Sequence, residues 1–342
     1  MTGRKLRWGI ISTGKIARTF ARALAVSESG ELTAVASRTT ESAAAFAAEF
    51  GISGAHGSYQ ALLADPEVEA VYIATPHPYH AQWSIAAARA KKHVLCEKPL
   101  GMNHAVVSAI VQAARDNDVF LMEAFMYRCH PQTLEVKRLL RAGALGRVKG
   151  IQASFCIDGA YPASGRMLNN ELGGGGILDI GCYPVSMARL VAGVVNGEQF
   201  SEPLSLKALG FVGESSRVDE YSSAILKFPG EIVATLSSAV QLWQDNSVRI
   251  FGSEGRLLLR TPWQPAHGSD ASEIVIERPE QEPEVIRVPS PGTLYGYEID
   301  VVRAELEQRQ ASEMSWADSL GNALTLDRWR SALGVTFAAD HV

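Results

Sequence analysis

The chain has 342 residues, of which 46% are hydrophobic and 20% are charged, and its formal net charge at pH 7 is −5. This length and composition are typical of a globular protein of about two domains. The negative charge argues against nucleic acid or an anionic membrane as a partner. We see no amino-terminal apolar signal region and no apolar run of the roughly 20 residues that a membrane span needs. We therefore expect a soluble, cytoplasmic protein.

Four cysteines, Cys96, Cys129, Cys156 and Cys182, are widely spaced and form no C-x-x-C pair. Zinc ribbons and disulfide scaffolds have closer, paired spacings. We therefore expect reduced thiols, as is usual in the cytoplasm.

Residues 1 to 125 alternate short apolar segments with helical patterns. The apolar segments do not alternate with polar residues, which is typical of strands buried on both faces of a parallel sheet. Because helical patterns separate them, they predict βαβ units and a doubly wound parallel sheet. The expected strands are LRWGII, LTAVAS, VEAVYIAT, KHVLCE and VFLMEA.

Residues 126 to 342 have a different pattern, which predicts a second domain of α+β type. Most of its strand-like segments are joined by hairpin signals, such as Pro229-Gly230 between DEYSSAILKF and EIVATLSSAV. We therefore expect an open, mostly antiparallel sheet. The expected helices are PQTLEVKRLLRAG and the segments at about 177–192, 294–310 and 317–333.

The segment RWGIISTGKIA, residues 7–17, resembles the G-x-G-x-x-G/A loop that binds dinucleotides, with Ser12 in place of the first glycine. Gly14 lets the backbone approach a pyrophosphate, and Ala17 lets the helix pack on the strand. We expect Ser12 to make the turn at a negative φ. The hydroxyl of Ser12 or Thr13 is placed to donate to a phosphate at the helix amino terminus. A plain strand-to-helix turn is the alternative.

The end of the second strand indicates which dinucleotide is bound. NAD-binding domains place Asp or Glu there to bind the ribose 2′-hydroxyl, whereas this chain has Ser37 and Arg38. Serine and arginine hydrogen-bond and neutralise a 2′-phosphate, so NADP is predicted and NAD is disfavoured. A solvated surface role for Arg38 is the alternative, and the nearby Glu41 tempers the prediction.

Two loops follow strands at the sheet edge where open α/β sheets bind ligands. In ATPHPYH, His77 and His80 are expected to line the nicotinamide end of the site. No third ligand of suitable spacing accompanies them, so we predict no metal. In CEKPLG, Lys98 precedes a proline, which favours an extended backbone. Basic surroundings lower a lysine pKa and suit it to proton transfer, although a surface lysine is the alternative.

In the second domain, ELGGGGILDIGCYPV places Asp179 and Tyr183 four residues apart on an apolar helix, and so on one face. The preceding glycine run permits a close backbone approach to another group. The pair either lines a cleft or consists of two polar groups that are satisfied separately.

These segments resemble the Gfo/Idh/MocA oxidoreductases. The resemblance covers essentially the whole chain and rests on GIISTGKIA, HVLCEKPLG, GGGGILDIGCYPV and ALGVTF. Within the family, the chain is most similar to the branch of dimeric trans-dihydrodiol dehydrogenases and NADP-dependent D-xylose dehydrogenases. The features that indicate this branch are Ser12, HPYH, FLMEAF with Arg128 soon after it, and Tyr183.

The resemblance implies a Rossmann domain at residues 1–125 and a domain for substrate binding and oligomerisation at residues 126–342. It implies hydride transfer between NADP and a sugar or cyclic polyol bound between the domains. It makes Lys98, Asp179 and Tyr183 catalytic, and it leaves open whether Lys98 or Tyr183 is the acid/base. Tyr183 stands where many members have histidine, and a phenol favours a donor or relay role.

The implied site comprises two sets of residues. The expected cofactor ligands are Ser12, Thr13, Gly14, Lys15, Ile16, Ser37, Arg38, Thr75, Pro76, His77, His80, Glu97, Lys98 and Arg128. The expected substrate ligands are Lys98, Arg128, Tyr161, Arg166, Asp179 and Tyr183, with Asn170 as a further candidate and His80 beside neighbouring hydroxyls.

The sequence indicates the class of reaction but not the substrate. An aldose 1-dehydrogenase or sugar ketoreductase is expected, and a trans-1,2-dihydrodiol dehydrogenase is the alternative. A non-catalytic NADP-binding regulator would not need Lys98, Asp179 and Tyr183. A methyltransferase-like domain is disfavoured by Ser37-Arg38. The resemblance also implies a homodimer or homotetramer formed through the second-domain sheet.

Overall fold

The computed structural model describes residues 4–159, 161–162, 164–266 and 268–341. Residues 1–3, Ala160, Ala163, His267 and Val342 lie outside this described part. The chain forms two compact units: unit 1 is Met1–Cys129 with Gly292–Leu320, and unit 2 is His130–Pro291 with Gly321–Val342. Residues 292–320 thus pack with the first unit, whereas the predicted domains divide the chain once, at residue 125.

Unit 1 is built on a six-stranded sheet in the order β3-β2-β1-β4-β5-β6. All its strand pairs are parallel, which confirms the predicted doubly wound sheet. The strands are β1 (Leu6–Ile11), β2 (Gly30–Ala36), β3 (Gly54–His56), β4 (Ala70–Ile73), β5 (His93–Glu97) and β6 (Leu121–Ala124). Strands β4 and β6 are buried throughout, as expected of strands in a parallel sheet that is covered on both faces.

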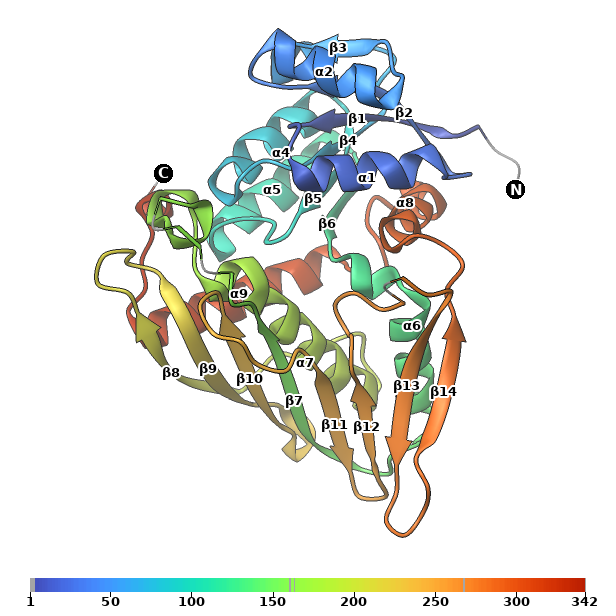
Figure 1. Cartoon of the computed structure of the whole chain (residues 1–342), viewed down its shortest axis with the longest axis vertical. Coiled ribbons are helices and arrows are strands. Elements are labelled where there is room, and N and C mark those ends of the chain that lie inside the picture. The colour runs from blue at the N-terminus through green and yellow to red at the C-terminus, as the bar shows by residue number, and fades with distance from the viewer. Residues whose placement is uncertain (1–3, 160, 163, 267, 342) are drawn as a thin grey trace. The chain divides into compact units, whose positions relative to one another are not determined.

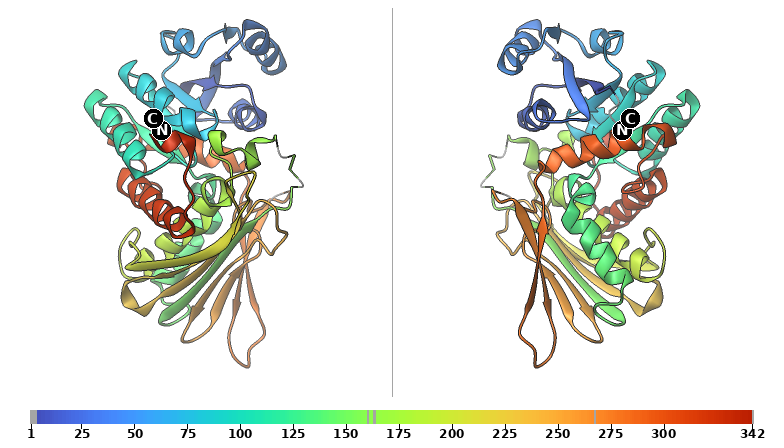
Figure 2. Two further views of the ribbon diagram at one scale, coloured as in Figure 1. Left: turned by 90° about the vertical axis from the view of Figure 1, so that its left-hand side faces the viewer. Right: turned by 90° about the vertical axis from the view of Figure 1, so that its right-hand side faces the viewer.

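Helices cover both faces of this sheet, with α1 and α8 on one face and α4 and α5 on the other (Figures 1 and 2). Helix α8 comes from the end of the chain and packs on α1 and β2 through its buried face, which includes Ile299. The helices are α1 (Lys15–Ala25), α2 (Thr40–Phe50), α3 (Tyr59–Leu63), α4 (His80–Arg89), α5 (His104–Asn117) and α8 (Leu294–Ala304), with the short turns η1 (His77–Tyr79), η2 (Met126–Cys129) and η7 (Leu306–Gln308).

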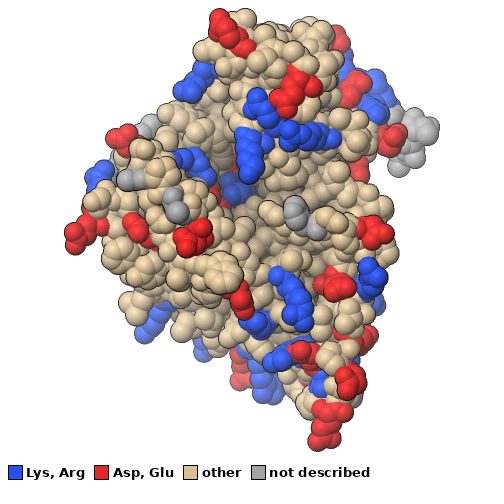
Figure 3. Space-filling view, in the orientation of Figure 1, with Lys and Arg blue, Asp and Glu red and all other residues tan. Residues whose placement is uncertain are grey.

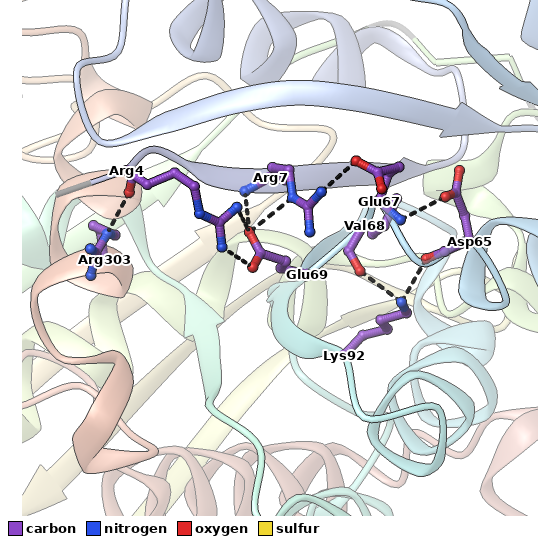
Figure 4. A network of polar contacts seen from close by, with 8 residues as sticks. All are labelled: Arg4, Arg7, Asp65, Glu67, Val68, Glu69, Lys92 and Arg303. Atoms are coloured by element: carbon purple, nitrogen blue, oxygen red, sulfur yellow. Dashed lines mark hydrogen bonds and ion pairs between the residues drawn. The ribbon is translucent and has the colours of Figure 1, made fainter.

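A charged network fixes the amino end of the sheet (Figure 4). The Glu69 carboxylate accepts hydrogen bonds from Arg4 at 2.9 Å and from Arg7 at 3.2 Å. The Lys92 ammonium donates to the carbonyls of Asp65 and Val68, each at 2.7 Å. Open α/β sheets bind ligands at the opposite, carboxyl edge. The network therefore joins strands and loops and leaves that edge to the ligand.

Unit 2 is built on an eight-stranded sheet in the order β14-β13-β12-β11-β7-β10-β9-β8. Only β7 and β10 pair in parallel among its strands, which confirms the predicted mostly antiparallel sheet. The strands are β7 (Val148–Cys156), β8 (Ser205–Val212), β9 (Asp219–Lys227), β10 (Val233–Ala239), β11 (Val248–Gly252), β12 (Arg256–Leu259), β13 (Ala271–Glu277) and β14 (Glu284–Pro289).

Helices α6 and α7 pack on one face of this sheet (Figure 2). The remaining helical elements of unit 2 are mostly short turns, and the boundary between the units falls inside α9. The helical elements described here are α6 (Pro131–Arg141), α7 (Cys182–Val195), α9 (Trp316–Leu333), η3 (Arg166–Leu168), η4 (Asn170–Leu172), the π-helical turn η5 (Ile177–Gly181), η6 (Pro229–Glu231) and η8 (Ala338–His341).

One helical stretch among the described residues, Asn170–Val195, is long and apolar enough to cross a membrane by length and composition. The sequence predicts no apolar run of this length, whereas this helical stretch meets the criterion of length and composition. Its most apolar window is wholly buried in the structure, as in the core helix of a folded protein. On the face drawn in Figure 3, acidic and basic side chains are interspersed.

Candidate active site

The amino terminus of α1 is open to an anion. The loop from Ser12 to Gly14 joins β1 to α1 at the carboxyl edge of the sheet. Gly14 makes no side-chain cap, and the first turn of α1 contains no acidic residue. The N–H groups at a helix start need partners, and the helix dipole favours negative charge there. This end of α1 therefore suits a phosphate group.

Ser12 occupies the conformation that the missing glycine would take. Its φ is +96°, so the expectation of a negative φ was wrong. Its backbone N–H donates to the Ala36 carbonyl at 3.0 Å, a bond that ties the loop to β2. The dinucleotide turn thus keeps its glycine geometry, although a serine must adopt it at an energetic cost.

Gly14 is not required by the fold. Its φ is −71°, which any residue adopts, and it is exposed. Among the described atoms, a Cβ added at Gly14 would meet only the Ser12 hydroxyl, at 3.9 Å. The space above Gly14 therefore fits the close approach of a pyrophosphate.

The end of β2 presents an exposed guanidinium. Ser37 is buried and donates its backbone N–H to the His56 carbonyl at 3.1 Å. Arg38 is exposed and makes no ion pair with any other described residue. Glu41 lies in the first turn of α2, which Thr39 caps. Because no carboxylate among the described residues forms an ion pair with Arg38, its guanidinium is able to bind a phosphate.

His80, which follows β4, is a buried residue that contacts two backbone carbonyls. It is fully buried, and its two ring nitrogens lie 2.8 Å from the carbonyls of Thr75 and Pro99. Burial lowers the pKa of His80 to about 3, so the ring is neutral and donates to one carbonyl at a time. His80 therefore joins the loops after β4 and β5. Ligand contact by His80 remains a prediction that would require these contacts to open.

Side chains from the neighbouring strands β4 and β6 fix the loop that carries Lys98. The Glu123 carboxylate on β6 accepts the Leu100 N–H at 2.9 Å, and Tyr72 on β4 donates its hydroxyl to Glu97. Lys98 itself is half-buried, and the Lys98–Pro99 bond is cis. Sequence reasoning missed Glu123 and Tyr72, because their pairing depends on strand order. Lys98 thus stands on a fixed backbone at the ligand-binding edge of the sheet.

Arg128 forms a buried ion pair. Its guanidinium lies 2.5 Å from Asp318 and also donates to the Glu313 carbonyl at 3.0 Å. Only 3% of Arg128 is exposed. The structure therefore gives Arg128 a role in joining η2 to the carboxyl-terminal part of unit 1. The expected contact with cofactor or substrate stays a prediction and needs this pair to rearrange.

The other expected cofactor residues lie in the same loops of unit 1. Thr75 is buried, and its hydroxyl has no hydrogen-bond partner among the described residues, so it is able to bond a ligand. His77 is buried and contacts His80 edge to face, with ring centroids 5.7 Å apart. Thr13, Lys15, Ile16 and Pro76 are exposed or half-buried. Among the described residues, no group of three or more metal-ligating side chains gathers.

In unit 2, the helix that carries Asp179 begins as a π-helical turn. The turn η5 runs from Ile177 to Gly181, and α7 continues from Cys182. The prediction of one α-helical face for Asp179 and Tyr183 therefore applies only in part, because a π turn rotates residues differently. Such turns are frequent at functional sites.

Asp179 is paired with one of the expected substrate residues. The Arg166 guanidinium donates to the Asp179 carboxylate at 2.8 Å. Burial raises the pKa of the nearby Tyr161, as does the Asp179 charge, while Arg166 opposes this. The structure thus brings Tyr161, Arg166 and Asp179 together within unit 2. An ionised pair beside a phenol is a suitable polar surface for hydroxyl groups.

Asn170 does not belong to that group. Its amide donates to the carbonyls of Arg217 at 2.9 Å and Thr336 at 2.8 Å, and it accepts the Ala338 N–H at 3.1 Å. It is also buried. The amide of Asn170 thus links three backbone segments, and the candidate substrate role for Asn170 stays a prediction that would require these contacts to open.

Tyr183 lies in an aromatic cluster that the sequence analysis missed. Its ring centroid is 5.2 Å from that of Phe155 and 5.7 Å from that of Trp263. Phe155 and Trp263 stack at 5.8 Å, and the Trp263 indole donates to the Ser154 carbonyl at 2.8 Å. The three residues come from α7, β7 and the loop after β12, so no local pattern could have shown the cluster.

Comparison with known proteins identifies the family. Residues 6–125 match the family model of the oxidoreductase family with an NAD-binding Rossmann fold, and residues 133–258 match that of the GFO/IDH/MocA C-terminal domain. Trans-1,2-dihydrobenzene-1,2-diol dehydrogenase of Danio rerio is 37% identical over 98% of this chain and 99% of its own length. The enzyme of that name from Homo sapiens is 31% identical over the same shares.

Solved structures agree with this result. A 3-ketoreductase from Actinomadura kijaniata, in complex with NADP and TDP-benzene, has a TM-score of 0.85 and 29% identity, covering 96% of this chain and 98% of its own. An aldose-aldose oxidoreductase from Caulobacter crescentus has the same fold, with a TM-score of 0.85 at 24% identity over 96% and 97%. The predicted family and fold are confirmed. The chain belongs to the Gfo/Idh/MocA family of nicotinamide-dependent oxidoreductases.

Proposed function

We propose that the chain is an NADP-dependent oxidoreductase that transfers hydride between the nicotinamide and a CH–OH carbon of a sugar or cyclic polyol. One observation carries the choice of cofactor: Arg38 is exposed at the end of β2, where it has no ion-pair partner among the described residues. An acidic residue there would repel a 2′-phosphate. The Actinomadura ketoreductase, a relative, was crystallised with NADP.

The proposed cofactor fits the residues of unit 1. The α1 terminus and Gly14 would hold the pyrophosphate, and Ser37 and Arg38 the adenosine ribose with its phosphate. Thr75, with its buried and unpartnered hydroxyl, would contact the cofactor near the ends of β4 and β5. When bound, NADP supplies the hydride acceptor or donor at the nicotinamide.

The proton is handled by the chain's own side chains. In oxidation, the substrate hydroxyl loses its proton as its carbon loses hydride, and we assign this proton to Tyr183 or Lys98. Lys98 stands on a backbone held by His80 and Glu123. Asp179, paired with Arg166, would orient a substrate hydroxyl. Positioned groups of this kind contribute about 10²–10⁴-fold to the rate.

The aromatic cluster favours a ring substrate with an apolar face. Phe155 is half-buried and stacks on Trp263 next to Tyr183, so a flat or cyclic carbon skeleton would find apolar surface beside the phenol. This favours trans-1,2-dihydrodiol oxidation as a second candidate activity beside aldose or ketose chemistry. The relatives from Danio rerio and Homo sapiens are named for that reaction.

We also propose that the protein is a cytoplasmic homodimer or homotetramer. All four cysteines are buried free thiols, in agreement with a reducing compartment. Strand β9 alternates buried and exposed residues, so one sheet face presents apolar side chains to solvent. The exposed apolar residues on β8, β9, β10 and the segment after β10 are Leu209, Phe211, Tyr221, Ile225, Val233, Leu242 and Trp243. A second copy would cover such a patch.

Absorbance at 340 nm tests the proposed function. Wild type, Lys98→Ala and Tyr183→Phe are mixed with NADP⁺ and with trans-1,2-dihydrobenzene-1,2-diol, aldoses or inositols, while NADPH binding is measured by fluorescence. Wild type should turn over at least one class, and Lys98→Ala should lose about 10²-fold or more in kcat while still binding NADPH. Normal turnover by Lys98→Ala would remove its assigned role. NADPH binding without turnover of any probe would favour the non-catalytic regulator.

A further inference from the structure

Asp219 is a buried carboxylate that contacts the start of the helical segment that carries Asp179 and Tyr183. It is the first residue of β9 and is fully buried. Its carboxylate accepts the backbone N–H of Ile177 at 2.6 Å. Ile177 opens the π turn η5, and Asp179 lies two residues further on. Asp219 therefore holds the start of this turn from a strand 42 residues away in the sequence.

The glycine run before the turn makes room for this carboxylate. A Cβ added at Gly175 would lie 2.5 Å from Asp219 Oδ1, and Gly175 also has a φ of +95°. A Cβ added at Gly176 would lie 2.7 Å from the Ser238 hydroxyl and 3.2 Å from Asp219 Oδ2. The close approach that the glycine run permits is thus to Asp219 and Ser238.

The charge of Asp219 affects how well it performs this role. An ionised carboxylate accepts a stronger hydrogen bond than a neutral one, and it interacts favourably with a helix amino terminus. Burial raises the pKa of Asp219 to about 7, although the Ile177 N–H and the Arg330 guanidinium act in the opposite direction. Arg330 on α9 is itself paired with Asp327 and Asp340, and Ser238 on β10 does not titrate near neutrality.

We propose that Asp219 is a positioning residue for the reaction, and that its ionised carboxylate fixes the turn Ile177–Gly181 and so the placement of Asp179 against Arg166. The proposal rests on the proposed function, in which Asp179 and Tyr183 act on the substrate. When Asp219 takes up a proton, its acceptor strength falls and the turn gains freedom. The enzyme should therefore lose catalytic efficiency as the pH falls through the pKa of Asp219.

The pH profile of kcat/KM in Asp219→Asn tests this role. The amide keeps a hydrogen-bond acceptor of similar shape but does not titrate. Ser238→Ala is the matched control, because Ser238 approaches the same Gly176 and carries no titratable group. NADP⁺ and trans-1,2-dihydrobenzene-1,2-diol are the probes. Wild type and Ser238→Ala should lose about tenfold in kcat/KM between pH 8 and pH 6. Asp219→Asn should lack that dependence and start roughly tenfold lower at pH 8.

Hydrogen exchange of the amides in 176–181 gives a readout that does not need turnover. Exchange in wild type should quicken between pH 8 and pH 6, once corrected for intrinsic rates, and should be fast at both pH values in Asp219→Asn. Equal exchange in the two proteins, or an unchanged pH limb in Asp219→Asn, would overturn the proposal. Absence of turnover in wild type would contradict the proposed function alone, since the exchange comparison still decides the role of Asp219.

Discussion

At the scale of the residue, we propose that cofactor selection depends on the guanidinium of one residue, Arg38. Arg38 is exposed beside α2, and burial raises the pKa of its neighbour Tyr59 while the Arg38 charge lowers it. Tyr59 in turn contacts Trp83 edge to face, with ring centroids 4.8 Å apart. Arg38 thus stands beside an aromatic surface and in solvent, where a guanidinium binds a phosphate through paired donors.

Replacing Arg38 separates the two nicotinamide cofactors. Arg38→Ala should weaken NADPH binding by about 10–100-fold and leave NADH binding nearly unchanged, because only NADPH has the 2′-phosphate. Titration of cofactor fluorescence measures both affinities. Arg22→Ala is the control, since Arg22 is also exposed in unit 1 and should affect neither cofactor. Equal discrimination in Arg38→Ala and wild type would show that Arg38 does not read the phosphate.

At the scale of the element, the glycine in β1 and the glycine at the start of α1 have different surroundings. Gly9 lies in β1, where an added Cβ would be 2.9 Å from the side chains of Leu62 and Val68. Gly14 has open space instead, since the single near atom is 3.9 Å away. Gly9 is therefore needed for packing, whereas the open space at Gly14 supports the proposed approach of a pyrophosphate.

Two alanine variants distinguish these needs. Gly9→Ala should lower the free energy of unfolding by about 1–3 kcal/mol through overpacking. Gly14→Ala should keep the wild-type stability and weaken NADPH binding by about tenfold or more, because the methyl group would stand where the pyrophosphate approaches. Urea unfolding and cofactor titration measure the two effects. Unchanged NADPH affinity in Gly14→Ala would argue against this loop as the pyrophosphate site.

The elements that the sequence predicts are those with a local signal. Apolar runs and helical patterns predicted both sheets. The Lys98 and Asp179 motifs indicate candidate functional segments, and the roles of these residues stay predictions. The predicted negative φ of Ser12 was wrong, because the loop imposes the backbone conformation of a glycine on this serine. Asp219, Glu123 and Trp263 gave no local signal, since their partners are far away in the chain. The burial of His80 likewise depends on two loops meeting.

At the scale of the whole molecule, each unit contains a buried neutral histidine. Burial lowers the pKa of His80 to about 3 in unit 1 and that of His130 to about 4 in unit 2. His130 caps α6 by accepting the Gln132 N–H at 3.0 Å. The unfolded chain takes up these protons near pH 6.5. Stability from this source is present above that pH and is lost as the pH falls toward the folded pKa values.

Replacing His130 should reduce this sensitivity to acid. Asn is a good helix cap that does not titrate, so His130→Asn should lose about 2 kcal/mol less of the free energy of unfolding than wild type between pH 7 and pH 5. Urea unfolding at both pH values measures this loss in each protein. The raised pKa of Asp219 acts in the opposite direction, but it contributes equally to both proteins and cancels when the two losses are subtracted. An equal loss in both proteins would mean that His130 is not held neutral.

The division of the chain into units also belongs to this scale. Strand β6 ends at Ala124, and helix α8 begins only at Leu294, after the last strand of unit 2 has ended at Pro289. Helix α8 nevertheless packs on α1 of unit 1. Its own sequence is an ordinary amphipathic helix, and which sheet it covers is decided by tertiary packing. The compact units therefore add residues 292–320 to the first unit, and the predicted functional domains, with their boundary at residue 125, stay a prediction.

Transfer of a labelled hydrogen shows whether the protein moves hydride from its substrate to NADP⁺. A substrate turned over in the 340 nm assay is prepared with deuterium on its CH–OH carbon and incubated with the protein and NADP⁺. Mass spectrometry then shows where the deuterium goes. We expect the NADPH formed to carry the deuterium, and none to enter it from D₂O when the substrate is unlabelled. Unlabelled NADPH from the labelled substrate would rule out direct hydride transfer.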